Sequence, residues 1–293
     1  MKKPLLAVAG VALIVAVGVL AYPHLFGRGD SLPTWTLATY SGGVEVSLAG
    51  AEWVPADMKM LLTDRDRVRT GDDGEATLLS RESHVTVRPL TQLEVSHLTR
   101  ESSRFQVAAG HVLVEARGDR ISMHAPAGAH VDAENAGLGM IVKEDGFTQV
   151  QVRRGEADFT SMNRTERVHE GEVSEAEPGR PPTAPVAIPQ VILLNVRFPD
   201  ADTFNSRLAR IEGKADPGSR VWVGGRYVPV DRTGEWTADL ELEEGINQIE
   251  VKASDALGRS RTERSSPIRV DTEAPPLDGA IIGSRAVAPA KPR

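Results

Sequence analysis

The stretch LTDRDRVRTGDDGEATLLSRESHVTVRPLTQLEV, residues 62–95, decides the fold class of this chain. Apolar and polar side chains alternate inside short runs, which are broken at residues 70–74, at residues 81–83 and at Pro89. Successive side chains of a strand point to opposite faces, so this pattern predicts half-buried strands joined by tight turns. The alternating apolar positions are Val68, Ala76, Leu78, Val85, Val87, Leu93 and Val95.

Composition narrows the class of protein. The chain has 293 residues, more than one typical domain, and its 40% hydrophobic and 26% charged content is ordinary for packed globular protein. Its 34 Lys and Arg against 41 Asp and Glu give a net charge of -7, without a long block of either sign. Nucleic-acid binding requires clustered Lys and Arg at phosphates, so we expect no nucleic-acid partner. The absence of cysteine excludes disulfides, thiolate metal sites and Cys nucleophiles.

The N-terminal segment predicts export. Lys2 and Lys3 precede an uncharged apolar run that starts at Leu5 and ends at Tyr22. At ~1.5 Å per residue, a helix of this length crosses a hydrocarbon core of ~30 Å, and the positive flank favours a cytoplasmic N-terminus. We interpret residues 1–30 as a membrane anchor, with a signal peptide cleaved near Ala21 as the alternative. The expected location is the cell envelope, anchored in the inner membrane with the bulk in the periplasm, or secreted if the segment is cleaved.

Residues 34–175 are predicted to form one all-β domain. Short alternating segments recur with glycines between them, and no helical apolar spacing is sustained there. Many short strands at such intervals favour a β-sandwich, a jelly roll or a coiled β-helix-like module. The expected strands after the first ones are 104–107, 112–116, 120–123, 140–142, 148–152 and 156–159, punctuated by Gly110, Gly118, Gly146, Gly155 and Gly171.

A series of motifs runs through this region: WVP at 53–55, DRVRTG at 66–71, ATL at 76–78, VTVRP at 85–89, LEV at 93–95, AGHVLV at 109–114, APAG at 125–128 and VQVRRGEA at 150–157. In order and spacing they resemble the FecR-type periplasmic domain, over about half of the chain. The signal-transmitting members of that family regulate sigma factors through a cytoplasmic domain ahead of the membrane segment. Only Met1, Lys2 and Lys3 precede the segment here. We therefore expect a passive envelope module.

The histidines suggest a competing hypothesis. Four of them recur thirteen or fourteen residues apart, a fifth follows closely, and a sheet could bring such residues onto one face. Imidazoles converging at ~2.0–2.1 Å on a metal would make a cupin-like enzyme. Residues 126–130 miss the second cupin motif by one position, and no His-x-His pair exists. We expect no metal and no cofactor. The histidines are His84, His97, His111, His124 and His130.

A second β domain follows a proline-rich linker. Residues 176–190 carry five prolines, which favour an extended spacer, and residues 272–293 have the composition of a disordered tail. Between them, residues 191–271 alternate again, with IEG at 211–213, VWV at 221–223, GEW at 234–236, LEEGIN at 242–247 and IEV at 249–251. This region resembles bacterial Ig-like modules of the glucodextranase domain-B type. The resemblance implies an Ig-like β-sandwich and no active site.

One hairpin of this second domain yields the candidate contact site. If residues 224–225 form a two-residue turn, the valines around it share the core face and an aromatic pair faces outward. Trp222 and Tyr227, with Arg226 beside them, would then stack on a sugar ring or anchor a protein partner. The alternative is cross-strand packing that stabilises the hairpin by ~0.2–1 kcal/mol. The predicted pairs are Val223–Arg226, Trp222–Tyr227 and Val221–Val228.

These observations favour a non-enzymatic, membrane-tethered envelope protein. No Gly-x-Ser-x-Gly, His-Glu-x-x-His or phosphate-binding glycine loop occurs in the sequence. We expect two β modules that bind or scaffold another envelope component, protein or polysaccharide. The first alternative is an envelope sensor that passes a signal to a partner membrane protein. The second is the cupin-like metal enzyme.

Overall fold

The computed structural model describes residues 34–199 and 203–272, and all regular secondary structure in these ranges is β-strand. The predicted all-β class is confirmed there. Within these ranges no helix is long and apolar enough to span a bilayer. The anchor expected in residues 1–30 lies outside the described residues. The described residues form two compact units. The first contains the residues up to 192 together with residues 218–220 and 254–261, and the second contains the other described residues after 192.

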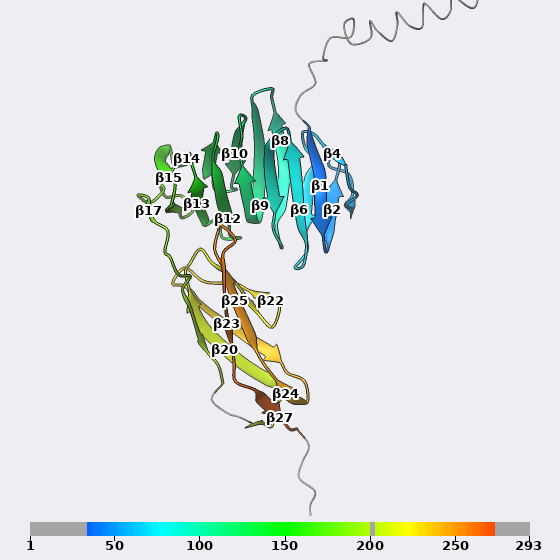
Figure 1. Cartoon of the computed structure of the whole chain (residues 1–293), viewed down its shortest axis with the longest axis vertical. Helices are drawn as coiled ribbons and strands as arrows, with labels where there is room; N and C mark the ends of the chain where they lie inside the picture. Colours follow the sequence, from blue (N-terminus) through cyan, green and yellow to red (C-terminus); the bar gives the residue numbers. More distant parts are fainter. Residues whose placement is uncertain (1–33, 200–202, 273–293) are drawn as a thin grey trace, which may run out of the picture. The chain divides into compact units, whose positions relative to one another are not determined.

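The first unit contains seventeen strands in one hydrogen-bonded array that forms two layers (Figure 1). The long strand β9 (Ser102–Glu115) belongs to both layers. One layer runs in the order β4 (Leu61–Leu62), β1 (Trp35–Ser41), β6 (Glu75–Ser80), β7 (Ser83–Val87), β9, β12 (Gly137–Val142), β13 (Thr148–Arg154), β16 (Glu172–Ala176) and β17 (Val186–Ala187).

The other layer pairs with the first half of β9. It runs in the order β3 (Val54–Pro55), β2 (Val44–Ser47), β5 (Arg67–Thr70), β8 (Gln92–Leu98), β9, β10 (Arg120–His124), β11 (His130–Ala133), β14 (Glu156–Ser161) and β15 (Arg164–His169). Buried apolar side chains from both layers form one continuous core, as in a β-sandwich.

Gly110 lets β9 pass from one layer to the other. Its φ is 119°, and a Cβ at this position would lie 2.3 Å from the Thr91 Oγ1. The prediction of two strands, 104–107 and 112–116, with Gly110 as a turn between them was therefore wrong. The glycine bends a continuous strand instead, because it accepts a backbone conformation that a side chain would exclude.

The alternating positions of residues 62–95 fill the core as predicted. The seven apolar side chains named for that stretch are each at most 1% exposed. The turn within the stretch at residues 81–83 joins β6 to β7, where Ser80 pairs with Ser83 and Arg81 adopts a φ of 52°. At the centre of the core, the ring of Trp35 meets that of Phe105 edge-on at 5.0 Å, and its Nε1 donates a hydrogen bond to the Ser103 Oγ.

The chain after residue 192 forms three small sheets of short strands. The predicted linker holds β17, which pairs with β16 of the first unit. The sheets are β18 (Leu194–Arg197), β20 (Leu208–Ala215) and β23 (Glu235–Glu241); β22 (Arg226–Val228), β21 (Arg220–Val223), β25 (Glu250–Ser254) and β26 (Ser260–Arg264); and β19 (Thr203–Phe204), β27 (Ile268–Val270) and β24 (Gly245–Asn247).

Candidate functional site

The predicted hairpin forms in the predicted register. Val221 pairs with Val228, Trp222 with Tyr227, and Val223 with Arg226. The turn glycines have φ values of 55° and 81°, the left-handed conformation that a two-residue hairpin turn requires. The valine side chains of β21 and β22 are buried. Local pattern and turn chemistry alone therefore fix this part of the second unit.

The aromatic pair lies on the opposite face of the hairpin from the valines. The rings of Trp222 and Tyr227 are 5.9 Å apart at an interplanar angle of 64°, an edge-on contact, and both side chains are half-buried. The Arg226 side chain is exposed, but Arg226 pairs with Val223 and therefore lies on the valine face of the hairpin, so the structure does not bring it together with the aromatic pair. Such a pair gives a partly apolar surface, which suits a sugar ring or an aromatic partner side chain. Its role as a contact site stays a prediction.

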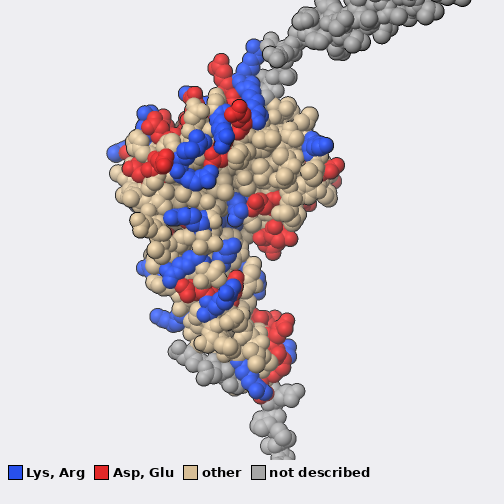
Figure 2. Space-filling view, viewed as in Figure 1, with Lys and Arg blue, Asp and Glu red and all other residues tan. Residues whose placement is uncertain are grey.

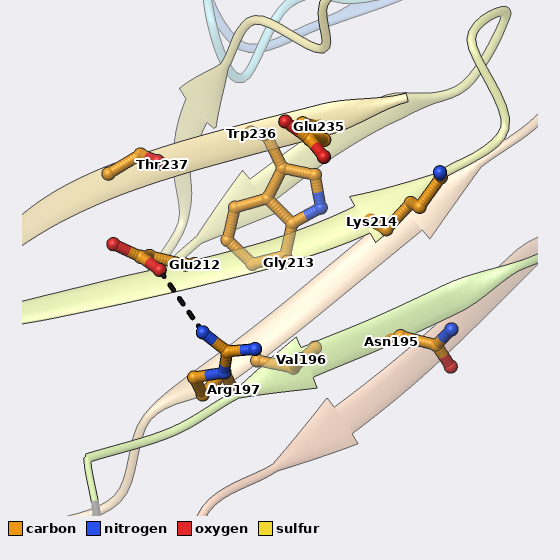
Figure 3. A pocket seen from close by; sticks show the side chains of 9 residues that line it. All are labelled: Asn195, Val196, Arg197, Glu212, Gly213, Lys214, Glu235, Trp236 and Thr237. Atoms are coloured by element: carbon orange, nitrogen blue, oxygen red, sulfur yellow. Dashed lines mark ion pairs between the residues drawn. The ribbon is translucent and has the colours of Figure 1, made fainter. Parts of the chain in front are cut away.

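A second surface feature of this unit is a groove of about 490 Å³ on the sheet of β18, β20 and β23. Six polar side chains line it, two from each strand, and alternate strand positions place them on one face of the sheet. Figure 3 shows these side chains, and the indole of Trp236 that reaches from β23 toward Gly213 of β20. The six are Asn195, Arg197, Glu212, Lys214, Glu235 and Thr237.

The strand register sets the shape of the groove. One row across the three strands is Asn195, Lys214 and Glu235, and the other is Arg197, Glu212 and Thr237. Between these rows lies the row of Val196, Gly213 and Trp236, whose Cβ positions face the other side of the sheet. The floor of the groove is therefore largely backbone, and its walls are polar side chains.

The charges in the groove are mixed. Glu212 forms ion pairs with Arg197 at 3.7 Å and with Arg210 at 3.3 Å. Beneath the groove, the indole Nε1 of Trp236 is buried, and no described residue accepts a hydrogen bond from it. A buried donor left unpaired costs about 1–3 kcal/mol, so this position of the sheet is not optimised for stability alone.

The sequence interpretation missed this groove. Its polar side chains come from three strands distant in sequence, and each strand by itself shows only ordinary polar alternation. The available signal was the spacing of the charged residues 212 and 214 and of the polar residues 235 and 237, which indicates an outward face but not the register that aligns the rows. The hairpin residues lie on the sheet of β22, β21, β25 and β26, and the groove lies on the sheet of β18, β20 and β23. The structure therefore does not bring them into one site.

The first unit has a smaller polar hollow of about 350 Å³ on β10, β11, β14 and β15. Arg167 binds Asp158 at 2.9 Å and Glu156 at 3.3 Å, and Arg120 lies 3.7 Å from Glu134. These charges neutralise one another across neighbouring strands. The hollow is therefore explained by ion pairing within the sheet.

The five histidines do not converge. His84 and His111 belong to one layer, whereas His97, His124 and His130 belong to the other. Only His124 and His130 meet, with rings stacked at 4.8 Å, and burial lowers the pKa of His124. Among the described residues, no group of three or more His, Cys, Asp and Glu is placed to hold a metal ion.

His111 is buried in the first unit. Its backbone N–H donates to the Thr91 Oγ1 at 2.9 Å. Burial lowers the pKa of its imidazole from 6.5 to about 3. The side chain is therefore neutral in the folded protein at any pH near neutrality, which suits a structural role.

Comparison with known proteins gives few matches. No family model and no curated protein matches the chain. Two crystal structures of a candidate anti-sigma factor from Parabacteroides distasonis, at 1.65 and 2.50 Å, are similar at 12% and 11% identity with TM-scores of 0.37 and 0.38. The matches cover 41% and 46% of this chain and 59% and 68% of theirs. A polysaccharide lyase matches at 12% identity with a TM-score of 0.20, over 84% of this chain and 40% of its own. The FecR-type and Ig-like resemblances stay predictions from the sequence motifs.

Proposed function

We propose that this protein is a non-enzymatic, membrane-tethered envelope protein that binds an envelope polysaccharide through its second unit. The observation that carries the proposal is the groove on β18, β20 and β23, with a backbone floor and polar walls. Its volume of about 490 Å³ falls in the range of small-ligand sites and suits a short stretch of a glycan chain.

The chemistry of the walls favours a sugar over a protein surface. The centre of a protein–protein interface is depleted of charged residues and enriched in aromatic ones. This groove instead presents an amide, a hydroxyl, two carboxylates and two cations, which are groups that hydrogen-bond sugar hydroxyls. The Trp222 and Tyr227 pair, on the other sheet, supplies a second contact of the stacking type.

The tether and the location come from the sequence. The apolar run between Leu5 and Tyr22, behind Lys2 and Lys3, supports an inner-membrane anchor with the β units in the periplasm. The FecR-type and Ig-like resemblances support the same placement, because both are envelope modules. The protein would therefore combine a membrane-attached first unit with a ligand-binding second unit.

The test is binding of the full chain, held in lipid nanodiscs, to a panel of neutral and acidic envelope polysaccharides. We expect Lys214→Ala and Arg197→Ala each to weaken binding about tenfold, equivalent to ~1.4 kcal/mol. Arg210→Ala is the matched control, since Arg210 pairs with Glu212 but does not line the groove. Its binding should stay unchanged.

Three outcomes separate the alternatives. Loss of binding in Trp222→Ala with both groove variants intact would move the site to the hairpin. Absence of binding to every polysaccharide would overturn the proposed ligand. Release of new reducing ends from a bound polysaccharide would overturn the non-enzymatic assignment.

A further inference from the structure

One edge of the first unit exposes an unusual set of large apolar side chains. Val54, Met58, Leu61 and Leu79 are 43%, 54%, 59% and 42% exposed. We call these four residues the edge patch. Exposed apolar side chains that gather at one place mark contact surfaces, whereas scattered ones need no explanation.

The strand register places three of these residues at one edge and Leu79 two strands in from it. Val54 lies on β3 and Leu61 on β4, the strands that end the two layers at the same side of the unit. Met58 lies on the segment that connects these strands. Leu61 and Leu79 both pair with Thr36 of β1 and so flank it on one face.

The charges around this surface are separate and of both signs. Figure 2 shows that the part of the first unit labelled β1, β2 and β4 in Figure 1 carries few Lys, Arg, Asp and Glu on the face in view. The opposite end of the unit, at β14 and β15, carries charges that form several ion pairs. On the segment that carries Val54, Met58 and Leu61, the exposed charged residues are Glu52, Asp57, Lys59, Asp64 and Arg65.

The chain reaches this unit at the edge patch. β1 is the first strand, and its second residue, Thr36, is the direct neighbour of Leu61. Only residues 23–34 separate the apolar run ending at Tyr22 from Trp35, a span of at most about 40 Å when fully extended. A membrane entered by that run therefore lies within reach of the edge where the patch is found.

We propose that the edge patch rests on the surface of the lipid bilayer that holds the residues from Leu5 to Tyr22. This inference rests on the membrane tether of the proposed function. Apolar side chains at the boundary between headgroups and acyl chains bury surface at the lipid, and Lys59 can reach anionic headgroups as its stem follows that surface. The first unit would then have a fixed orientation on the membrane.

Site-specific labelling tests this contact. Because the natural chain has no cysteine, Leu61→Cys and Met58→Cys each give one labelling site for an environment-sensitive fluorophore. Thr165→Cys is the control, since Thr165 is exposed on β15 at the other end of the layer. Full-length chains are reconstituted into vesicles whose lipids carry brominated acyl chains, and vesicle flotation reports the tether independently.

We expect the label at position 61 or 58 to lose at least half of its fluorescence in brominated vesicles, and the label at 165 to stay unchanged. Equal fluorescence at all three positions in chains that float would overturn the inference and leave the tether intact. Chains that fail to float would overturn the tether, and the inference with it. Equal quenching of the labels at 61 and 165 by a soluble quencher, in vesicles that contain no other protein, would show that the patch is open to solvent there. That result would also overturn the inference and would leave the patch free for a protein partner.

Discussion

Trp236 on β23 lies directly opposite Gly213 on β20, and its indole occupies the space that a side chain at position 213 would need. A Cβ built at Gly213 would lie 2.2 Å from the Trp236 Cζ2 and 2.4 Å from the Asn195 carbonyl oxygen. The glycine and the indole therefore form one packing unit beneath the groove. Backbone atoms on one side and a buried ring on the other leave little room for adjustment.

The first prediction follows from this pair. Gly213→Ala should destabilise the second unit by about 1–3 kcal/mol, the usual cost of overpacking. The control Gly71→Ala adds a Cβ with its nearest neighbour at 3.5 Å and should cost much less. Unfolding by urea with Trp fluorescence as the readout measures both. Combining Gly213→Ala with Trp236→Leu should cost less than the sum of the single changes; an additive result would contradict the steric account.

The second prediction concerns the hairpin turn. Gly225 has a φ of 81° and no atom within 4 Å of an added Cβ, so only backbone conformation opposes a side chain there. Gly225→Ala should destabilise by about 1–2 kcal/mol, whereas Gly225→Asn should cost clearly less, because Asn tolerates the left-handed region. Thermal unfolding of both variants checks this order. Equal destabilisation would show that the turn adopts another conformation.

The third prediction separates stability from binding at the aromatic pair. A double-mutant cycle of Trp222→Ala and Tyr227→Ala should give a coupling of about 0.5–1 kcal/mol in the free energy of unfolding, from their edge-on contact. A larger loss of polysaccharide affinity than this in Trp222→Ala would identify a binding role. Coupling near zero would mean that the two rings do not pack in solution.

The fourth prediction is a pH dependence. The pKa of His111 is lowered from 6.5 to about 3 by burial, so below pH 6.5 the unfolded chain binds a proton there that the folded chain does not. The free energy of unfolding should therefore be unaffected by this group above pH 6.5 and fall between pH 6.5 and 3. The slope for one proton is at most about 1.4 kcal/mol per pH unit.

Urea unfolding at pH 7, 6, 5 and 4 measures that slope. His111→Gln removes this titration while His84 and His124, whose pKa values are also lowered by burial, remain. The variant should lose less stability between pH 7 and 4 than the natural chain. Parallel curves would mean that His111 takes up its proton at the same pH in the folded and the unfolded chain, contrary to this prediction.

Sequence reasoning succeeded where local rules decide structure. The alternation around Val68, Leu78 and Val85 gave the buried face, and the glycine pair at 224–225 gave the hairpin register residue by residue. Both depend on contacts within a few residues, on period and on turn type. The all-β class follows from the same local pattern.

The remaining features depend on pairings between distant strands. The sequence predicts a break between two strands at Gly110 because a glycine looks the same in a turn and in a bent strand, and only the contact with Thr91 distinguishes them. The groove needs the alignment of Glu212 with Arg197 and Thr237, which no single strand encodes. Register between remote strands is set by the whole core.

The sharing of β9 by both layers of the first unit has a consequence for how that unit comes apart. A strand that is hydrogen-bonded to β8 and β10 in one layer and to β7 and β12 in the other prevents either layer from melting alone. We expect a single cooperative transition, with the slowest hydrogen exchange of the unit along Ser102–Glu115. On a membrane surface, this unit would therefore act as one rigid block.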